Sequence, residues 1–389
     1  MAKLGLVITQ VRGVSYSPKD LHDSLNDESI ILLRANNIKD GKINFDDVVY
    51  IDKKKVNKNQ YLCQGDVLIC TSSGSKELVG KAAFFSENTI ATFGTFCKVI
   101  RPSIPCKEFI GHFFNSPFYR REISSLSSGA NINNIRNEHI DNLEINLPTE
   151  NIQEAITRRL NLVNSLIESR QKQLSKLDQL VKSRFIEMFG DPVKNPLGWD
   201  TRPFLSMGYC KNGMNFHTGD SGIKMHCLGV GDFKDYSIID GTDHLPTISL
   251  KETPPEESML QDGDILFVRS NGNKALVGRS LIVYPRNTPT TYSGFCIRYR
   301  LTSFDVNIIY LLCVLKADSM RKKMIGRGAN IQNLNQQILA TLDIPIPPIY
   351  IQEQFAAFVQ QVDKAKSSVK QSLEKLETLK KSLMQEYFG

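Results

Sequence analysis

The chain has 389 residues, of which 41% are hydrophobic and 23% charged, and its formal net charge is +7. Such a chain can bury more than one core, and no apolar run reaches the ~18 residues that a membrane span needs. We therefore expect a cytoplasmic protein with several structural units and no membrane partner. The mild basic excess is compatible with nucleic-acid binding but does not require it.

Residues 1–148 are predicted to form a first domain, in which strands precede a helix. A β-like run covers residues 29–36, and a buried strand is expected at Val67–Cys70, before a polar loop. Apolar residues at helical spacing then predict one helix over 107–125. The pattern indicates a mixed α/β fold. It leaves open whether the first strand, near Lys3, is complete.

Residues 149–190 are predicted to form a long helix, because apolar residues alternate at spacings of three and four from Ile152 to Phe189, with no Gly or Pro in between. A helix of this length needs a partner helix. The Pro- and Gly-rich segment 191–198 ends it and begins the next domain.

The rest of the chain repeats this plan, with a second domain at 191–348 and a second helix at 349–389. Ile152-Gln153-Glu154 returns 199 residues further on as Ile351-Gln352-Glu353, and Phe189-Gly190 returns as Phe388-Gly389. The chain is thus a tandem duplication. Two similar halves favour a pseudo-two-fold arrangement in which the long helices form an antiparallel coiled coil.

The residues expected at the interface of the helix pair share the apolar face of the two helices. They are Val163, Leu174, Leu177, Leu180, Val362, Leu373, Leu376 and Leu379. Arg170, Lys366 and Lys380 also fall on this face, where charged residues usually extend toward solvent and can specify the register.

Two equivalent loops carry the candidate DNA contacts. The run from Gly74 to Lys81 is not a phosphate-binding loop, because five residues separate its glycines and no Ser or Thr follows the lysine. Cations on such a loop can instead meet a phosphate backbone. The candidates, together with one arginine near the end of the 29–36 run, are Arg34, Lys76, Lys81, Arg269, Lys274 and Arg279.

No motif indicates catalysis or a cofactor. The histidines are isolated, the acidic residues do not cluster at metal-binding spacing, and the eight cysteines form no C-x-x-C pair. Asn195-Pro196-Leu197-Gly198 begins like the Asn-Pro-Pro-aromatic motif of amino-methyltransferases but has Gly in the fourth position. We interpret it as a linker that ends the helix.

The order of these features resembles the specificity subunits of type I restriction-modification systems over essentially the whole chain. The shared plan includes two variable domains, each followed by a long helix, and prolines (Leu147-Pro148; Ile346-Pro347-Pro348) that lead into Ile-Gln-Glu. The resemblance implies two target-recognition domains, each binding one half of a split double-stranded DNA site. Because the two domains differ in sequence, the site is expected to be asymmetric.

The resemblance also implies partners. Two modification (methyltransferase) subunits would dock on the helices, restriction (translocase and nuclease) subunits would join the assembly, and S-adenosylmethionine would bind to the modification subunit and not to this chain. Two other classes stay open on the residues alone: a stand-alone DNA methyltransferase or nuclease, and a coiled-coil scaffold that binds no DNA.

Overall fold

The computed structural model describes residues 1–75, 78–128, 134–216, 222–233, 237–325 and 333–389. The chain divides into two compact units, one made of Met1–Lys172 and Lys370–Gly389 and the other of Gln173–Val369. Each unit therefore contains part of both long helices, whereas the predicted boundaries treat each helix as a segment of its own. Both units are mixed α/β structures, as the sequence predicts.

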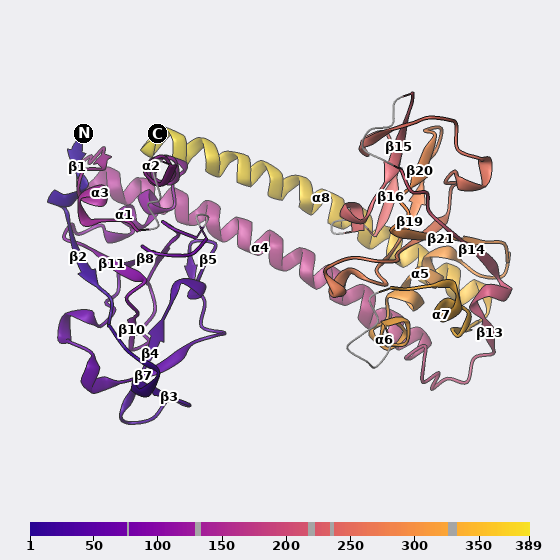
Figure 1. Ribbon diagram of the computed structural model, residues 1–389, viewed down its shortest axis with the longest axis horizontal. Helices are drawn as coiled ribbons and strands as arrows, with labels where there is room; N and C mark the ends of the chain where they lie inside the picture. Colours follow the sequence, from indigo (N-terminus) through magenta and orange to yellow (C-terminus); the bar gives the residue numbers. More distant parts are fainter. Residues whose placement is uncertain (76–77, 129–133, 217–221, 234–236, 326–332) are drawn as a thin grey trace. The chain divides into compact units, whose positions relative to one another are not determined.

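The first unit is built on two four-stranded sheets (Figure 1). One has the order β2-β11-β8-β9, with antiparallel neighbours, and the other has the order β10-β4-β7-β3, in which β10 and β4 are parallel. Two small sheets, β1-β12 and β5-β6, complete the set. The strand bounds are β1 Ala2–Lys3, β2 Ile8–Arg12, β3 Leu21–His22, β4 Ser29–Leu33, β5 Ile38–Lys39, β6 Lys42–Ile43, β7 Val49–Asp52, β8 Val67–Cys70, β9 Ala82–Phe84, β10 Ala91–Phe93, β11 Cys97–Pro102 and β12 Glu144–Ile145.

Two predicted bounds in this unit are wrong. The 29–36 run ends as a strand at Leu33, because the Asn37 side chain accepts a hydrogen bond from the Arg34 backbone N–H and folds residues 35–37 into a 3₁₀ turn. The helix expected over 107–125 is two helices, α1 (Lys107–Phe114) and α2 (Pro117–Ser128). Proline fits the first turn of a helix but breaks a helix interior. Pro117 therefore begins a new helix.

The second unit is also built on two main sheets, here of five and three strands (Figure 1). Its larger sheet has the order β14-β21-β18-β19-β16, its smaller sheet the order β17-β15-β20, and β13 pairs with β22. The strand bounds are β13 Thr201–Pro203, β14 Gly208–Asn212, β15 Ile223–Leu228, β16 Ile238–Asp240, β17 Thr247–Leu250, β18 Asp264–Val268, β19 Ser280–Tyr284, β20 Thr290–Tyr292, β21 Cys296–Leu301 and β22 Asp343–Pro345.

The helical run predicted after these strands is again divided, into α5 (Ile308–Lys316) and α6 (Asp318–Ile325). Ala317 between them has an extended ψ of 138°. Nothing in the local sequence signals this break. A short helix precedes the last strand of each unit, α3 (Asn137–Asp141) in the first and α7 (Gln336–Ala340) in the second.

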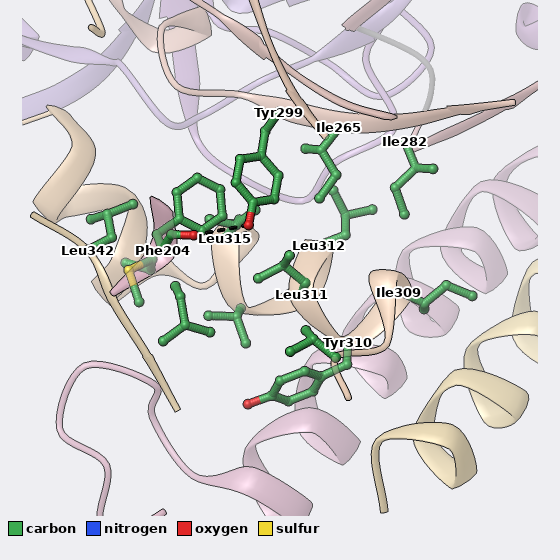
Figure 2. Packing of buried hydrophobic residues seen from close by; sticks show 14 of the residues in the cluster. Phe204, Ile265, Ile282, Tyr299, Ile309, Tyr310, Leu311, Leu312, Leu315 and Leu342 are labelled. Atoms are coloured by element: carbon green, nitrogen blue, oxygen red, sulfur yellow. Dashed lines mark hydrogen bonds between the residues drawn. The ribbon is translucent and has the colours of Figure 1, made fainter. Parts of the chain in front are cut away.

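The core of the second unit lies between the large sheet and α5 (Figure 2). Almost every residue of α5 is apolar, which is typical of a helix buried on all sides. Tyr299 stacks on Phe204 with ring centroids 4.0 Å apart, and its hydroxyl donates a hydrogen bond to the Phe204 carbonyl at 3.0 Å. The hydroxyl is thereby buried without losing a partner.

An ion pair recurs at the same place in both units. In the first, the Arg101 guanidinium donates to both carboxylate oxygens of Asp66, at 2.9 and 2.8 Å, and in the second Arg300 binds Asp264 in the same way at 2.8 Å. Both aspartates are 1% exposed. Planar two-point pairing of this kind is geometrically demanding. Its recurrence shows that the duplication predicted from the sequence is a duplication of the folded framework.

The two long helices are α4 (Glu150–Phe189) and α8 (Ile349–Phe388), each of 40 residues. Both begin with the same contact: the side-chain amides of Gln153 and Gln352 donate to the carbonyls of Pro148 and Pro347, at 2.7 and 2.6 Å. Gly190, at φ 75°, follows the end of α4. No helix among the described residues is long and apolar enough to cross a membrane.

The less exposed residues of α4 and α8 follow the predicted spacing of three and four. Val163 and Val362 are buried, and the half-buried members of the predicted interface are Leu174, Leu177, Leu373 and Leu376. Leu180 and Leu379 are 47% and 46% exposed, so their assignment to the interface is wrong. After Leu177 the alternation requires a step of four, which places Val181, and not Leu180, on the covered face.

Each unit holds the end of one long helix beside the start of the other. In the first unit, an Arg159 guanidinium N–H donates to the Tyr387 hydroxyl at 3.2 Å. In the second unit, the Phe355 ring lies 5.4 Å from that of Phe189, and Lys366 pairs with Asp178 at 2.7 Å. Lys366 therefore pairs across the two helices from the covered face.

Candidate nucleic-acid interface

Four segments of the first unit meet where β2 and β8 end and β11 begins. They are residues 12–15, 71–75, 94–96 and 134–138. The Val14 N–H donates to the Phe93 carbonyl at 2.8 Å, the Thr71 N–H to the Phe96 carbonyl at 2.9 Å, and the Ile135 N–H to the Thr71 carbonyl at 2.8 Å. These bonds fix the four segments against one another.

The same convergence occurs in the second unit, among residues 212–215, 269–273, 293–295 and 333–337. Met214 donates to the Tyr292 carbonyl at 3.1 Å, Arg269 to the Phe295 carbonyl at 2.8 Å, and Leu334 to the Arg269 carbonyl at 2.8 Å. We call the four segments the rim of each unit. Loops held in this way by a rigid scaffold are where binding residues most often lie.

An exposed phenylalanine stands on each rim. Phe96 and Phe295 are 64% and 61% exposed, and each is followed by a buried cysteine, Cys97 or Cys296. These residues are not among the candidates predicted from the sequence, although the Phe-Cys pair recurs at the same 199-residue interval as the other repeated motifs. Exposed aromatic side chains fixed on a turn are suited to contact with the bases of a nucleic acid.

The rim of the first unit borders a hollow of about 880 Å³. Its lining includes the cations Arg12, Lys98 and Arg136 and the carboxylates Glu138 and Asp141. Arg136 pairs with Glu138 at 3.3 Å. Arg12 is exposed and, within the described part of the chain, its guanidinium has no hydrogen-bond partner. The hollow thus presents positive charge that the acidic side chains balance only in part.

Lys98 is buried in the floor of this hollow. Its ammonium donates to the side-chain oxygens of Gln10 at 2.9 Å and Asn137 at 2.6 Å, and the Gln10 amide in turn donates to Asp141 at 2.7 Å. Burial lowers the pKa of Lys98, the charge of Asp141 raises it, and the nearby Arg12 lowers it further. This network ties α3 to the central strands and so positions the rim residues that precede α3.

The cations predicted from the sequence lie in different surroundings. The Arg34 guanidinium is committed to Asp47, at 3.3 Å. Lys81 and Arg279 occupy equivalent places, each at the end of the loop that follows β8 or β18; we call these the rim loops. The Lys81 carbonyl accepts a hydrogen bond from the Cys70 N–H, and the Arg279 carbonyl accepts one from the Val268 N–H. Both are half-buried.

Of the remaining predicted cations, Arg269 belongs to the rim of the second unit, and Lys274 lies exposed just after it, in a 3₁₀ turn. Lys76 falls outside the described residues. The structure adds Arg12, Lys98 and Arg136, which could not be predicted because they lie far from the loops in sequence.

The rim loops are also supported from the helices behind them. The Arg120 guanidinium of α2 donates to the Val79 carbonyl at 3.0 Å, and Arg321 of α6 donates to the Ala275 carbonyl at 2.6 Å. Among the described residues, no group of three or more His, Cys, Asp or Glu side chains is arranged to hold a metal ion.

The fold and the site define a class of protein: a duplicated recognition protein, whose two units share one framework and differ in the side chains on their rims. Comparison with known families gives the particular family. The family model described as "Type I restriction modification DNA specificity domain" matches residues 9–179 and 247–378. The chain belongs to this family.

Individual relatives agree with the family match. Over its whole length the chain is 30% identical to the type I restriction enzyme StySPI specificity subunit of Salmonella potsdam, of which it covers 88%. It is 28% identical, with the same coverage, to the EcoKI specificity subunit of Escherichia coli (strain K12). The crystal structure of the type I restriction-modification S subunit from M. genitalium shares the fold. The alignment covers the whole of the present chain and 95% of the M. genitalium chain, with a TM-score of 0.57 and 13% identity.

Proposed function

We propose that this chain is the DNA sequence-specificity subunit of a type I restriction-modification complex and binds a split, asymmetric site in double-stranded DNA. Each unit binds one half-site through its rim. The observation that carries the proposal is that the two rims have the same backbone frame, with matching hydrogen bonds, but different exposed side chains. A shared frame with divergent side chains is what two domains that bind different base sequences require.

The charges of the rims support contact with DNA. Phosphate contacts set the affinity and orientation of a protein on DNA, whereas contacts to base edges set its sequence preference. Lys81 and Arg279, beside the rims, are placed to contact phosphates. The side chains on the rims themselves, including Arg12, Phe96 and Phe295, are placed to contact bases.

The long helices provide the frame between the two half-sites and the platform for other subunits. We propose that α4 and α8 pair as an antiparallel coiled coil, supported by the spacing of their covered residues and by the Lys366–Asp178 pair. Two modification subunits dock on the helical region, and restriction subunits join the complex through them. Exposed leucines on α4, such as Leu162 at 61%, offer apolar contact area for such partners.

In this proposal the chain has no catalytic activity of its own, and S-adenosylmethionine binds to the modification subunit. The first test is methyl transfer in vitro. The purified chain with S-adenosylmethionine and DNA should transfer no methyl group, and addition of modification subunits should start transfer at one sequence. Methyl transfer by the chain alone would favour the stand-alone methyltransferase instead.

The second test assigns the half-sites. Replacing residues 200–340 by the matching segment of another family member should change one half of the methylated sequence and leave the other half unchanged. A mobility shift with random-sequence DNA at low salt separates the remaining alternative, because a scaffold that binds no DNA should give no shifted band.

A further inference from the structure

One rim position differs between the units in a way that matches the chemistry of two bases. Arg12 and Asn212 are the last residues of the equivalent strands β2 and β14. Each is followed by a glycine, Gly13 or Gly213, and both side chains are exposed. Within the described part of the chain, neither side chain makes a hydrogen bond. Both therefore have all their donors and acceptors free for a ligand.

The backbone at this position is held rigidly in both units. A Cβ atom on Gly13 or Gly213 would lie 2.1 Å from the carbonyl oxygen of Gly94 or Ser293, so the strand end passes directly beneath the rim turn that carries the exposed phenylalanine. The Arg12 carbonyl also accepts a hydrogen bond from the Gln60 side chain at 3.1 Å. A side chain that starts from a fixed backbone loses little freedom on binding, which favours selective contact.

The surroundings of the position change together with the residue. Arg12 lies opposite Lys98 in the β2–β11 ladder, so two cations are neighbours. Asn212 lies opposite Ile297 in the β14–β21 ladder and has an uncharged neighbour there. A cationic pair favours a partner with acceptors only, whereas an amide beside an apolar residue favours a partner that both donates and accepts.

In the major groove, guanine presents two adjacent acceptors, O6 and N7, and adenine presents an acceptor, N7, beside a donor, the N6 amino group. An arginine matches guanine and an asparagine matches adenine, each through two hydrogen bonds. We propose that Arg12 and Asn212 occupy one base-reading position of the duplicated frame, with Arg12 bound to a guanine of the first half-site and Asn212 bound to an adenine of the second. The inference rests on the proposed function.

The test exchanges the two residues in the full chain, expressed with its modification subunits. Methylated sequences are mapped genome-wide for the parent, for Arg12→Asn and for Asn212→Arg. Arg12→Asn should change or remove the requirement for one guanine in the first half-site, and the second half-site should not change. Asn212→Arg should change or remove the requirement for one adenine in the second half-site, and the first should not change. Affinity for the parent's site should fall on the order of tenfold to a hundredfold.

A conservative variant and a modified base separate a base contact from a phosphate contact. Lysine retains the charge of Arg12 but lacks the fork of two parallel donors, so Arg12→Lys should weaken the preference for guanine. Replacing the contacted guanine by 7-deazaguanine, which lacks the N7 acceptor, should weaken binding by the parent and not by Arg12→Asn. Lys39→Asn, at an exposed lysine of β5, is the charge-matched control and should leave the methylated sequence unchanged.

Three results have different meanings. If Arg12→Asn weakens binding equally at all sequences and Arg12→Lys restores it, Arg12 contacts a phosphate and the inference is overturned. An unchanged methylated sequence in Arg12→Asn would overturn it as well. If the parent chain with modification subunits directs no sequence-selective methylation, the proposed function itself fails, and that outcome is visible before any variant is made.

Discussion

The two units keep the same internal supports and differ at the surface those supports hold. Asp66–Arg101 and Asp264–Arg300 have matching geometry, whereas Arg12 has become Asn212. The difference extends beneath the rim, where the buried Lys98 of the first unit corresponds to Ile297. The frame thus tolerates exchange of rim and floor residues as long as the framework contacts remain, which is what a specificity protein needs.

The largest effect is expected from loss of the framework ion pair. Asp66→Ala and Asp264→Ala should each lower the free energy of unfolding by about 3 kcal/mol, because each removes the carboxylate from a partly buried arginine, which keeps only backbone carbonyl acceptors, and removes the acceptor of a backbone N–H. Urea unfolding with hydrogen exchange of β8 and β18 would measure both. Asp240→Ala, which removes an exposed partner of Arg286, is the control and should have little effect. Unequal effects of the first two variants would show that the pairs do not play the same role.

The next effect separates the covered face of the long helices from their exposed face. Leu177→Asp should destabilise the second unit by about 2 kcal/mol, because it places a charge at a half-buried apolar position. Leu180→Asp, three residues away and 47% exposed, is the matched control and should change little. Both variants are compared by urea unfolding and by assembly with modification subunits. Equal stability of the two variants would mean that the covered face is assigned wrongly.

The stability of the first unit should depend on pH in mild acid more than that of the second, and this effect should be smaller. Burial lowers the pKa of His112 below its ordinary 6.5, although Asn161 and Glu108 raise it, and Lys380 lowers it. The unfolded chain therefore binds more protons than the folded chain in mild acid. The stability that depends on neutral His112 is present above pH 6.5 and is lost as the pH falls through 6.5 toward the folded pKa.

The equivalent position in the second unit is Leu311, which is fully buried and does not titrate. Hydrogen exchange at several pH values should thus show α1 losing protection on acidification before α5 does. His112→Leu should remove that difference. If α1 and α5 lose protection together in the parent, His112 does not couple the first unit to pH.

The smallest effect concerns the two equivalent cations beside the rims. Lys81→Ala and Arg279→Ala should each weaken DNA binding to a similar extent at all sequences, and each should reduce the salt slope of log K by about one, if each side chain neutralises one phosphate. Binding titrations at several salt concentrations would measure this. A change of sequence preference in either variant would place that residue among the base contacts instead.

Local pattern was enough for the two long helices and for the strand Val67–Cys70. Val67–Cys70 is a strand with the predicted bounds, and α4 (Glu150–Phe189) lies within one residue of the predicted range 149–190 at each end, because a periodic apolar face without Gly or Pro has few other solutions. Leu180 and Leu379 were assigned wrongly because apolar character alone does not fix which side of a helix is covered. The break at Ala317 had no signal in the sequence.

The sequence by itself determined that the chain is duplicated, that each half ends in a long amphipathic helix, and to which family it belongs, since each of these depends on spacing and repetition along the chain. Only the tertiary structure decided which side chains form the rims. Residues 12, 71, 96 and 136 are far apart in sequence and meet because β2, β11 and β8 pair antiparallel, which brings the ends of two strands beside the start of the third. Hydrogen-bond pairing between distant segments leaves no periodic signal in either segment, so only the folded chain shows that Arg12 and Asn212 lie on the rims.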